Sequence, residues 1–215
     1  QEGRMKAPPS LWRPEDGIGV LEEVLSRGGI IAFPTESSYA YGVDPRNPEG
    51  VERVYVAKGR PASKALPVVV ASVGDLECLG VAPALEAIAQ LARIWPAPLT
   101  AVLPTTEDLP AAAGTGGIAV RIPAHAGLRR LLTELGPLTA TSANPSGEEP
   151  ALTAQQARAY LEGEDAVIVD GPALPGGPAS TLIRWDGGAW QVLREGAFPP
   201  VELKRLLVLR KEACP

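Results

Sequence analysis

Short apolar runs alternate along this chain with segments of helical periodicity, and no other feature restricts the fold as strongly. Residues 30–33 and 66–71 are continuous apolar runs that predict buried strands. Between them, residues 48–58 predict a helix with Asn47 as its cap. This alternation favours an α/β fold, a sheet flanked by helices. The Asp-Gly-Gly turn at 186–188 predicts a hairpin, so some strands pair antiparallel and we expect a twisted mixed β-sheet.

The remaining elements follow from the same signals. We expect further helices over 14–27, 83–95, 125–135, 153–161 and 200–208, a short helix from Ser72, and further strands over 99–103, 118–122, 138–140, 166–169, 181–185 and 190–193. Segments 34–39 and 171–178 are expected to be loops. No repeat or long linker interrupts the series, so we expect a single domain over 14–209, with an N-terminal extension over 1–13 and a C-terminal tail over 210–215.

The charge balance and the reactive side chains narrow the class of protein. The net charge of −5 argues against broad nonspecific binding of nucleic acid but leaves room for a local basic pocket. No apolar run approaches the roughly 20 residues of a membrane span, and residues 1–10 lack the apolar region of a secretory signal, so we expect a cytoplasmic protein. With Cys78 and Cys214 far apart and His125 the only histidine, neither a disulfide framework nor a protein metal site is expected.

Lys58, Arg60 and Lys64 place three cations within seven residues, where the predicted helix ends and a loop begins. The planar donor fork of Arg60 suits carboxylate or phosphate oxygens. The segment is therefore typical of an anion clamp on an exposed loop, although clustered cations are also common in solvated loops. Neither G-x-x-x-x-G-K-[ST] nor G-x-G-x-x-G occurs, so a nucleotide would need a different phosphate cradle.

A second polar segment begins where an apolar run ends at Ala140. Thr141, Ser142 and Asn144 offer hydroxyls and an amide at the end of a predicted strand, the place where open α/β sheets hold ligands. Ser and Asn also satisfy ordinary turns. These residues alone therefore leave both a structural turn and a binding site open, and the turn is the commoner use of such residues.

Arg121 is a charged residue inside the otherwise apolar predicted strand 118–122. An unpaired guanidinium is costly to bury, so Arg121 must face a partner. That partner is either a carboxylate of a bound substrate or a carboxylate of the protein, such as Glu36 or Asp44.

Taken together in chain order, these segments resemble the YrdC-like family of threonylcarbamoyl-AMP synthases. The matching segments are 34–36 with Tyr39 and Gly42, 58–64, 95–100, 119–123, 141–144 with Ser146 and Gly147, 178–181, and 193–196. The chain departs from the family pattern at Ala40 and Ala97, which replace glycines, and at Tyr41 and Ala65, which replace leucine and proline. Ala40 matters most, because a Cβ at a glycine position would narrow a substrate pocket or forbid a positive φ.

The resemblance implies a YrdC-like single domain with a basic concave pocket, and an enzyme of the nucleotidyltransferase class. It would join L-threonine, bicarbonate and ATP into threonylcarbamoyl-adenylate and pyrophosphate, for the threonylcarbamoyladenosine modification of tRNA. Mg²⁺ is expected with ATP, bridging the phosphates without a dedicated protein cage. A tRNA threonylcarbamoyltransferase complex is the implied downstream partner, and a weak contact with tRNA is compatible with this role.

The resemblance also assigns residues. The family's K-x-R and S-x-N signature, taken as the catalytic set, falls on Lys58, Arg60, Ser142 and Asn144. The implied ATP-binding residues are Lys58, Ala62, Gly117, Ser142, Ala143, Asn144 and Arg194, and the implied threonine-binding residues are Thr35, Lys64, Arg121, Thr141 and Ser180. Two alternatives stay open: a non-catalytic RNA-binding module, and a carbamoyl-adenylate-forming domain of another pathway.

Overall fold

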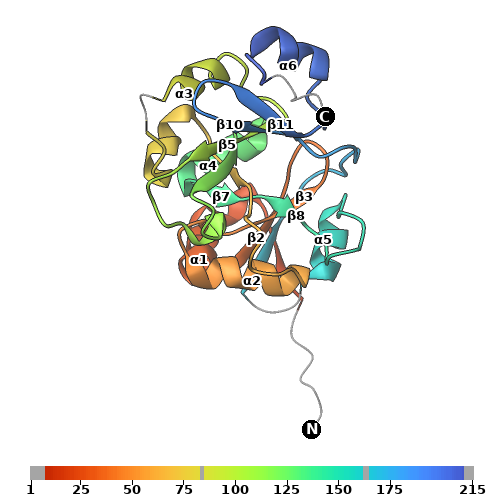
Figure 1. Cartoon of the computed structure of the whole chain (residues 1–215). Coiled ribbons are helices and arrows are strands. Elements are labelled where there is room, and N and C mark those ends of the chain that lie inside the picture. Colours follow the sequence, from red (N-terminus) through yellow and green to blue (C-terminus); the bar gives the residue numbers. More distant parts are fainter. Residues whose placement is uncertain (1–7, 83–84, 162–164, 211–215) are drawn as a thin grey trace.

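The computed structural model describes residues 8–82, 85–161 and 165–210 (Figure 1). The expected mixed α/β fold is confirmed, but the strands form two sheets rather than one. The first sheet has the order β1-β9-β2-β3-β8, formed by Ser10–Trp12, Ala166–Val169, Ile30–Pro34, Tyr39–Gly42 and Thr141–Ser142. The second has the order β11-β10-β5-β6-β4-β7, formed by Trp190–Arg194, Thr181–Trp185, Leu99–Pro104, Gly117–Arg121, Val68–Val69 and Leu138–Thr139.

Both sheets mix parallel and antiparallel pairs. In the first, β9 is parallel to β1 and β2, while β3 is antiparallel to β2 and β8. In the second, β10 is parallel to β5 and antiparallel to β11 across the predicted Asp-Gly-Gly hairpin. The helices are α1 to α6, at Gly19–Ser26, Pro48–Lys58, Glu86–Leu91, Ala126–Leu135, Ala154–Tyr160 and Pro200–Leu206. Figure 1 shows α1 and α2 at one end of the molecule and α6 at the other.

Two apolar clusters fill the fold, and strand β2 contributes to both. Ile30 and Ala32 join the larger cluster, which draws on both sheets and on α2, α3 and α5. Ile31 and Phe33 point to the opposite face and join a smaller cluster with residues of α1 and α4. A strand buried on both faces explains the unbroken apolar run that predicted it.

The segment from β7 to β8 carries the chain from the second sheet to the first. Leu138 and Thr139 pair with β4, whereas Thr141 and Ser142 pair with β3. The Thr139 hydroxyl, which accepts the N–H of Val43, fixes this crossing from within the core. The strand expected over 138–140 is confirmed at Leu138–Thr139, and Thr141–Ser142 form a separate strand because they have a different tertiary partner.

Several predicted elements are shorter than expected. Pro14–Asp16 form a 3-10 turn, and Gly17, with a φ of 80°, separates that turn from α1. Of the helix expected over 83–95, residues 83 and 84 lie outside the described residues, and α3 covers Glu86–Leu91 of the rest. The strand expected over 66–71 pairs at Val68–Val69. A 3-10 helix, Val73–Leu79, takes the place of the short helix expected from Ser72.

Two strands lie where the sequence predicts none. Strand β1, within the expected N-terminal extension, pairs with β9. Strand β3 forms a tight hairpin with β2, and a Cβ on Gly42 would lie 2.3 Å from the ring of Phe33. The bounds expected for the domain, 14–209, and for the C-terminal tail, 210–215, stay predictions.

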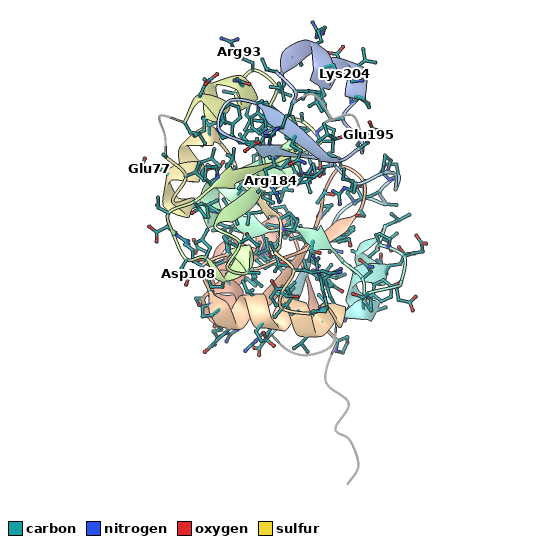
Figure 2. The ribbon with its side chains drawn as sticks, viewed as in Figure 1. Glu77, Arg93, Asp108, Arg184, Glu195 and Lys204 are labelled. Carbon is teal, nitrogen blue, oxygen red and sulfur yellow. The ribbon has the colours of Figure 1, made fainter. Side chains whose placement is uncertain are left out.

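The surface carries charges of both signs. Figure 2 labels six exposed examples, Glu77, Arg93, Asp108, Arg184, Glu195 and Lys204. None of the helices within the described residues has both the length and the apolar character required to cross a bilayer.

Candidate functional site

Lys58 is the last residue of helix α2. The helix starts at Asn47, whose side chain accepts the N–H groups of Glu49 and Gly50 at 3.0 and 3.2 Å. It ends because Gly59 adopts a left-handed conformation with a φ of 57°. The expectation that Lys58 lies on an exposed loop is wrong: it is 5% exposed. The 142–146 segment packs over it, and the Ser146 N–H donates to the Lys58 carbonyl at 2.7 Å.

The side chains of Lys58, Ser142 and Asn144 meet as the signature predicts. Nζ of Lys58 donates to the carbonyl oxygens of Ser142 and Asn144 at 2.6 and 2.9 Å. It also lies 3.4 Å from Oγ of Ser142 and 3.2 Å from Oδ1 of Asn144. Oγ of Ser142 donates to Oδ1 of Asn144 at 2.6 Å, which closes the network. Residues 84 and 86 positions from Lys58 in the chain thus form one cluster, which we call the lysine network.

The lysine network carries a positive charge that the protein does not neutralise. Within the described residues, no carboxylate forms an ion pair with Lys58. Burial, followed by the nearby charge of Arg60, lowers the pKa of Lys58 to about 8. The Tyr41 ring lies 5.9 Å from Nζ and is the nearest source of cation–π stabilisation. An ammonium group in this setting favours an anionic ligand.

Of the other residues in the predicted anion clamp, Arg60 lies near Lys58 but Lys64 does not. Nη2 of Arg60 donates to the Ala65 carbonyl at 3.3 Å, while its buried Nε has no hydrogen-bond partner in the described part of the chain. Ala62 and Lys64 are exposed. The Tyr55 hydroxyl holds the Lys64 carbonyl at 2.8 Å, so the loop is anchored by its backbone. The structure brings Arg60 near Lys58 but does not place the side chain of Lys64 against the lysine network.

Arg121, at the end of β6, pairs with Glu36 from the loop after β2. Both carboxylate oxygens lie 2.8 Å from Nη1 of Arg121, and Oε1 also accepts the Ala124 N–H at 2.6 Å. Burial raises the pKa of Glu36, but Arg121 and these hydrogen bonds outweigh it, and the net pKa lies below its usual value. Asp44, the other suggested partner, pairs with Arg46 instead.

Hydroxyl groups line the same end of the second sheet. The β5–β6 register ends at the Ala101–Val120 pair, one residue from Thr100 on β5 and one residue from Arg121 on β6. Oγ of Ser180 lies 2.7 Å from Oγ1 of Thr100, and Nη2 of Arg194 donates to the Ser180 carbonyl at 2.9 Å. The structure therefore brings Arg121 and Ser180 to one edge of the sheet. Thr100 was not predicted as a site residue, because nothing in its apolar strand distinguishes its hydroxyl from a packing one.

The other predicted residues serve backbone roles in this structure. Thr35 is buried, and its hydroxyl donates to the Ser38 carbonyl at 2.7 Å. Thr141 is buried in the β3–β8 pair. The Ala143 N–H donates to the Tyr39 carbonyl at 2.9 Å, so it is not available to a nucleotide. Gly117 starts β6, about 13 Å along the strand from Arg121 at roughly 3.3 Å per residue.

The two alanines that replace glycines of the family pattern are accommodated without backbone strain. Ala40 is buried in β3, paired with Ser142, and Ala97 donates its N–H to the Ile122 carbonyl at 3.1 Å. Among the described non-glycine residues only Ala113 has a positive φ. Neither alanine therefore forces a forbidden backbone.

A cavity of about 1190 Å³ lies beside β11 and α6. Arg194 is the one predicted site residue among the described residues that line it. The cavity is thus separate from the lysine network and from Arg121, and the expected basic concave pocket stays a prediction.

The backbone of Gly196 packs so closely against that of Ala179 and Ser180 that this position requires a glycine. A Cβ there would lie 2.2 Å from the Ala179 carbonyl oxygen and 2.7 Å from that of Ser180. We expect Gly196→Ala to lower the free energy of unfolding by about 1–3 kcal/mol, because overpacking displaces backbone. Chemical denaturation measures this. Gly19→Ala is the matched control, since a Cβ on Gly19 meets no described atom within 4 Å; an equal loss in both variants would contradict the steric account.

Comparison with known proteins gives consistent matches. The family model for Sua5, YciO and YrdC, described as telomere recombination, matches residues 23–196. A curated relative from Pyrococcus abyssi, named threonylcarbamoyl-AMP synthase, is 35% identical over 201 residues, which cover 91% of this chain and 57% of the relative. A relative of the same name from Thiobacillus denitrificans is 40% identical over 167 residues, covering 76% of this chain and 88% of the relative.

The fold matches a solved structure from the same family. The crystal structure of P. abyssi Sua5 complexed with L-threonine has a TM-score of 0.79 and 30% identity, covering 94% of this chain and 62% of that one. This chain therefore spans little more than half the length of the Pyrococcus relative.

Proposed function

Because this chain belongs to the Sua5/YciO/YrdC family, we propose that it is a threonylcarbamoyl-AMP synthase of the nucleotidyltransferase class. Its substrates would be L-threonine, bicarbonate and ATP, and its products threonylcarbamoyl-adenylate and pyrophosphate. The proposal is supported by the names of relatives that match most of this chain and by the L-threonine in the matched Sua5 structure. An RNA-binding module and another carbamoyl-adenylate pathway have no comparable support.

The proposal rests above all on the lysine network. Its buried ammonium has no carboxylate partner among the described residues, and its hydrogen bonds hold the segment from Ser142 to Asn144 around it. A fixed cation with preorganised donors stabilises the negative charge of a phosphate in transfer. Nζ of Lys58 has three protons but four acceptor atoms within hydrogen-bond distance. The longest of these contacts, 3.4 Å to Oγ of Ser142, is the weakest, so a phosphate oxygen would replace it first.

The chemistry needs charge stabilisation more than a strong base. The neutral amine of threonine adds to CO₂ derived from bicarbonate and gives a carbamate, and the amine proton leaves with the hydroxide of bicarbonate as water. A carbamate oxygen then attacks the α-phosphorus of ATP, the bond from that phosphorus to the bridging oxygen breaks, and pyrophosphate leaves. In our proposal Lys58, Ser142, Asn144 and Arg60 hold the phosphates. Arg121 and Ser180 hold threonine at the edge of the second sheet.

Mg²⁺ is proposed to enter with ATP. Among the described residues no three His, Cys, Asp or Glu side chains are grouped as metal ligands. Phosphate oxygens and water would complete the coordination of such an ion. Transfer of the product to tRNA by a separate threonylcarbamoyltransferase complex, in the cytoplasm, completes the proposal.

Omission of single substrates tests this function. We expect pyrophosphate release to require threonine and bicarbonate together, because the carbamate is the nucleophile. A continuous pyrophosphate assay with each component left out in turn measures it. ATP cleavage at the same rate without threonine or without bicarbonate would contradict the proposal.

ATP binding is expected to weaken as the pH rises through 8. The pKa of Lys58 is lowered to about 8 by burial and by Arg60, so the free protein loses this charge above that pH. The phosphates of ATP stabilise the ammonium, and binding then takes up a proton; the affinity falls by at most about tenfold per pH unit for one proton. Titration calorimetry in buffers of different ionisation enthalpy measures the uptake. Lys58→Met should remove it; an unchanged uptake in that variant would assign the proton to another group.

A further inference from the structure

The ion pair between Glu36 and Arg121 uses only one nitrogen of the guanidinium. Both carboxylate oxygens of Glu36 approach Nη1, each at 2.8 Å. Within the described residues, Nη2 and Nε of Arg121 make no hydrogen bond. The Nε–Nη2 edge of a guanidinium is a complete two-donor fork that matches a carboxylate. Arg121 therefore has one edge committed to the protein and one edge available to a ligand.

Glu36 is itself fixed from two directions. Its Oε1 accepts the Ala124 N–H at 2.6 Å, which ties it to the segment after β6. Its own turn is closed by Thr35, whose N–H and hydroxyl both donate to the Ser38 carbonyl, at 3.1 and 2.7 Å. The side chains of Arg121 and Glu36 are 13% and 25% exposed, so the contact is largely shielded from water. A carboxylate held this firmly restricts the rotation of Arg121.

The neighbours of Arg121 across the sheet are neutral. Arg121 pairs with Val69 of β4, and Thr100, one residue beyond the last β5–β6 pair, carries a hydroxyl that contacts that of Ser180. Glu36 is the one carboxylate among the described residues that forms an ion pair with Arg121. An anionic ligand that reached the available edge would thus meet hydroxyl groups rather than a second negative charge.

We propose that Glu36 is a positioning residue, which holds Nη1 of Arg121 so that the Nε–Nη2 edge binds the carboxylate of the amino-acid substrate. This inference rests on the proposed function and adds to it that Nη1 of Arg121 binds the protein while its Nε–Nη2 edge binds the substrate. Glu36 stays in place when the substrate binds. The lowered pKa of Glu36 is consistent with this role, because the carboxylate remains ionised at neutral pH.

Threonine binding to variants of Glu36 tests the inference. We expect Glu36→Ala to weaken L-threonine binding by about tenfold or more in titration calorimetry. The KM for threonine should rise by the same factor, while the KM for ATP and the kcat at saturating threonine stay unchanged. Glu36→Gln keeps an oxygen for the Ala124 N–H and should recover part of the loss. Asp165→Asn, which breaks an exposed ion pair with Arg53, is the matched control and should change nothing.

Three results would overturn the role of Glu36. Wild-type threonine affinity in Glu36→Ala would show that Arg121 needs no such support. Tighter binding would show that Glu36 occupies the place of the substrate carboxylate. Equal losses in threonine and ATP affinity, with a lowered melting temperature, would reduce Glu36 to a structural residue.

Different results would contradict the proposed function itself. A wild-type protein that binds threonine but releases no pyrophosphate would contradict the synthase proposal, and the binding titrations would still decide the role of Glu36. A wild-type protein that binds no threonine would overturn both.

Discussion

Lys58→Met is expected to lower the affinity for ATP by about 10- to 150-fold, the equivalent of a charged hydrogen bond worth about 1.5–3 kcal/mol. Turnover should fall further, by about 10²–10³-fold at saturating ATP, because a fixed donor acts most strongly on the charge of the transition state. Methionine fills a similar volume, so the effect isolates the ammonium group. Calorimetry with ATP and the pyrophosphate assay measure the two quantities.

Two comparisons separate this effect from damage to the fold. Lys204→Met removes an exposed lysine of α6 (Figure 2) and should leave both quantities unchanged. Lys58→Met also leaves the Asn144 carbonyl without its donor, so its unfolding must be followed in parallel. A protein that keeps wild-type ATP affinity after Lys58→Met would remove the lysine network from the nucleotide site.

Arg121→Lys should weaken threonine binding by about tenfold or more, a loss of about 1.4 kcal/mol or greater. Lysine keeps the positive charge, but its side chain is one bond shorter than that of arginine, so the contact with Glu36 is weakened and no second edge is left for a carboxylate. ATP affinity measured without threonine should change little. Titration of threonine beside a thermal melt measures the effect.

The opposite pattern would indicate a purely structural arginine. If the only role of Arg121 is to hold Glu36, the variant should melt at a lower temperature and bind threonine normally. That result would end the assignment of Arg121 to the substrate carboxylate.

The sequence predicts the parts of the site that depend on local signals. Asn47 and Pro48 mark the start of α2, and its eleven residues end at Lys58, as expected. The resemblance to the YrdC-like family groups Lys58 with Ser142 and Asn144, and the structure brings these three side chains together. What the residues could not show is that Lys58 is buried, because its burial depends on a segment more than 80 positions away.

The parts that failed depend on tertiary pairing. The two-residue strand β8 is too short to show a periodicity, and only its pairing with β3 defines it. The orientation of Arg121 shows the same limit. Its strand predicts that it needs a partner, but the choice of Glu36 over Asp44 follows from the turn that Thr35 and Ser38 close.

The most direct measurement follows bicarbonate into the product. The protein is incubated with ATP, L-threonine and ¹³C-labelled bicarbonate, and the nucleotides are analysed by mass spectrometry. We predict an adenylate that contains one threonine and one labelled carbon. One molecule of it should form for each molecule of pyrophosphate released. Pyrophosphate formed with only unlabelled adenine nucleotides, or no adenylate at all, would contradict the proposal that this site makes threonylcarbamoyl-adenylate.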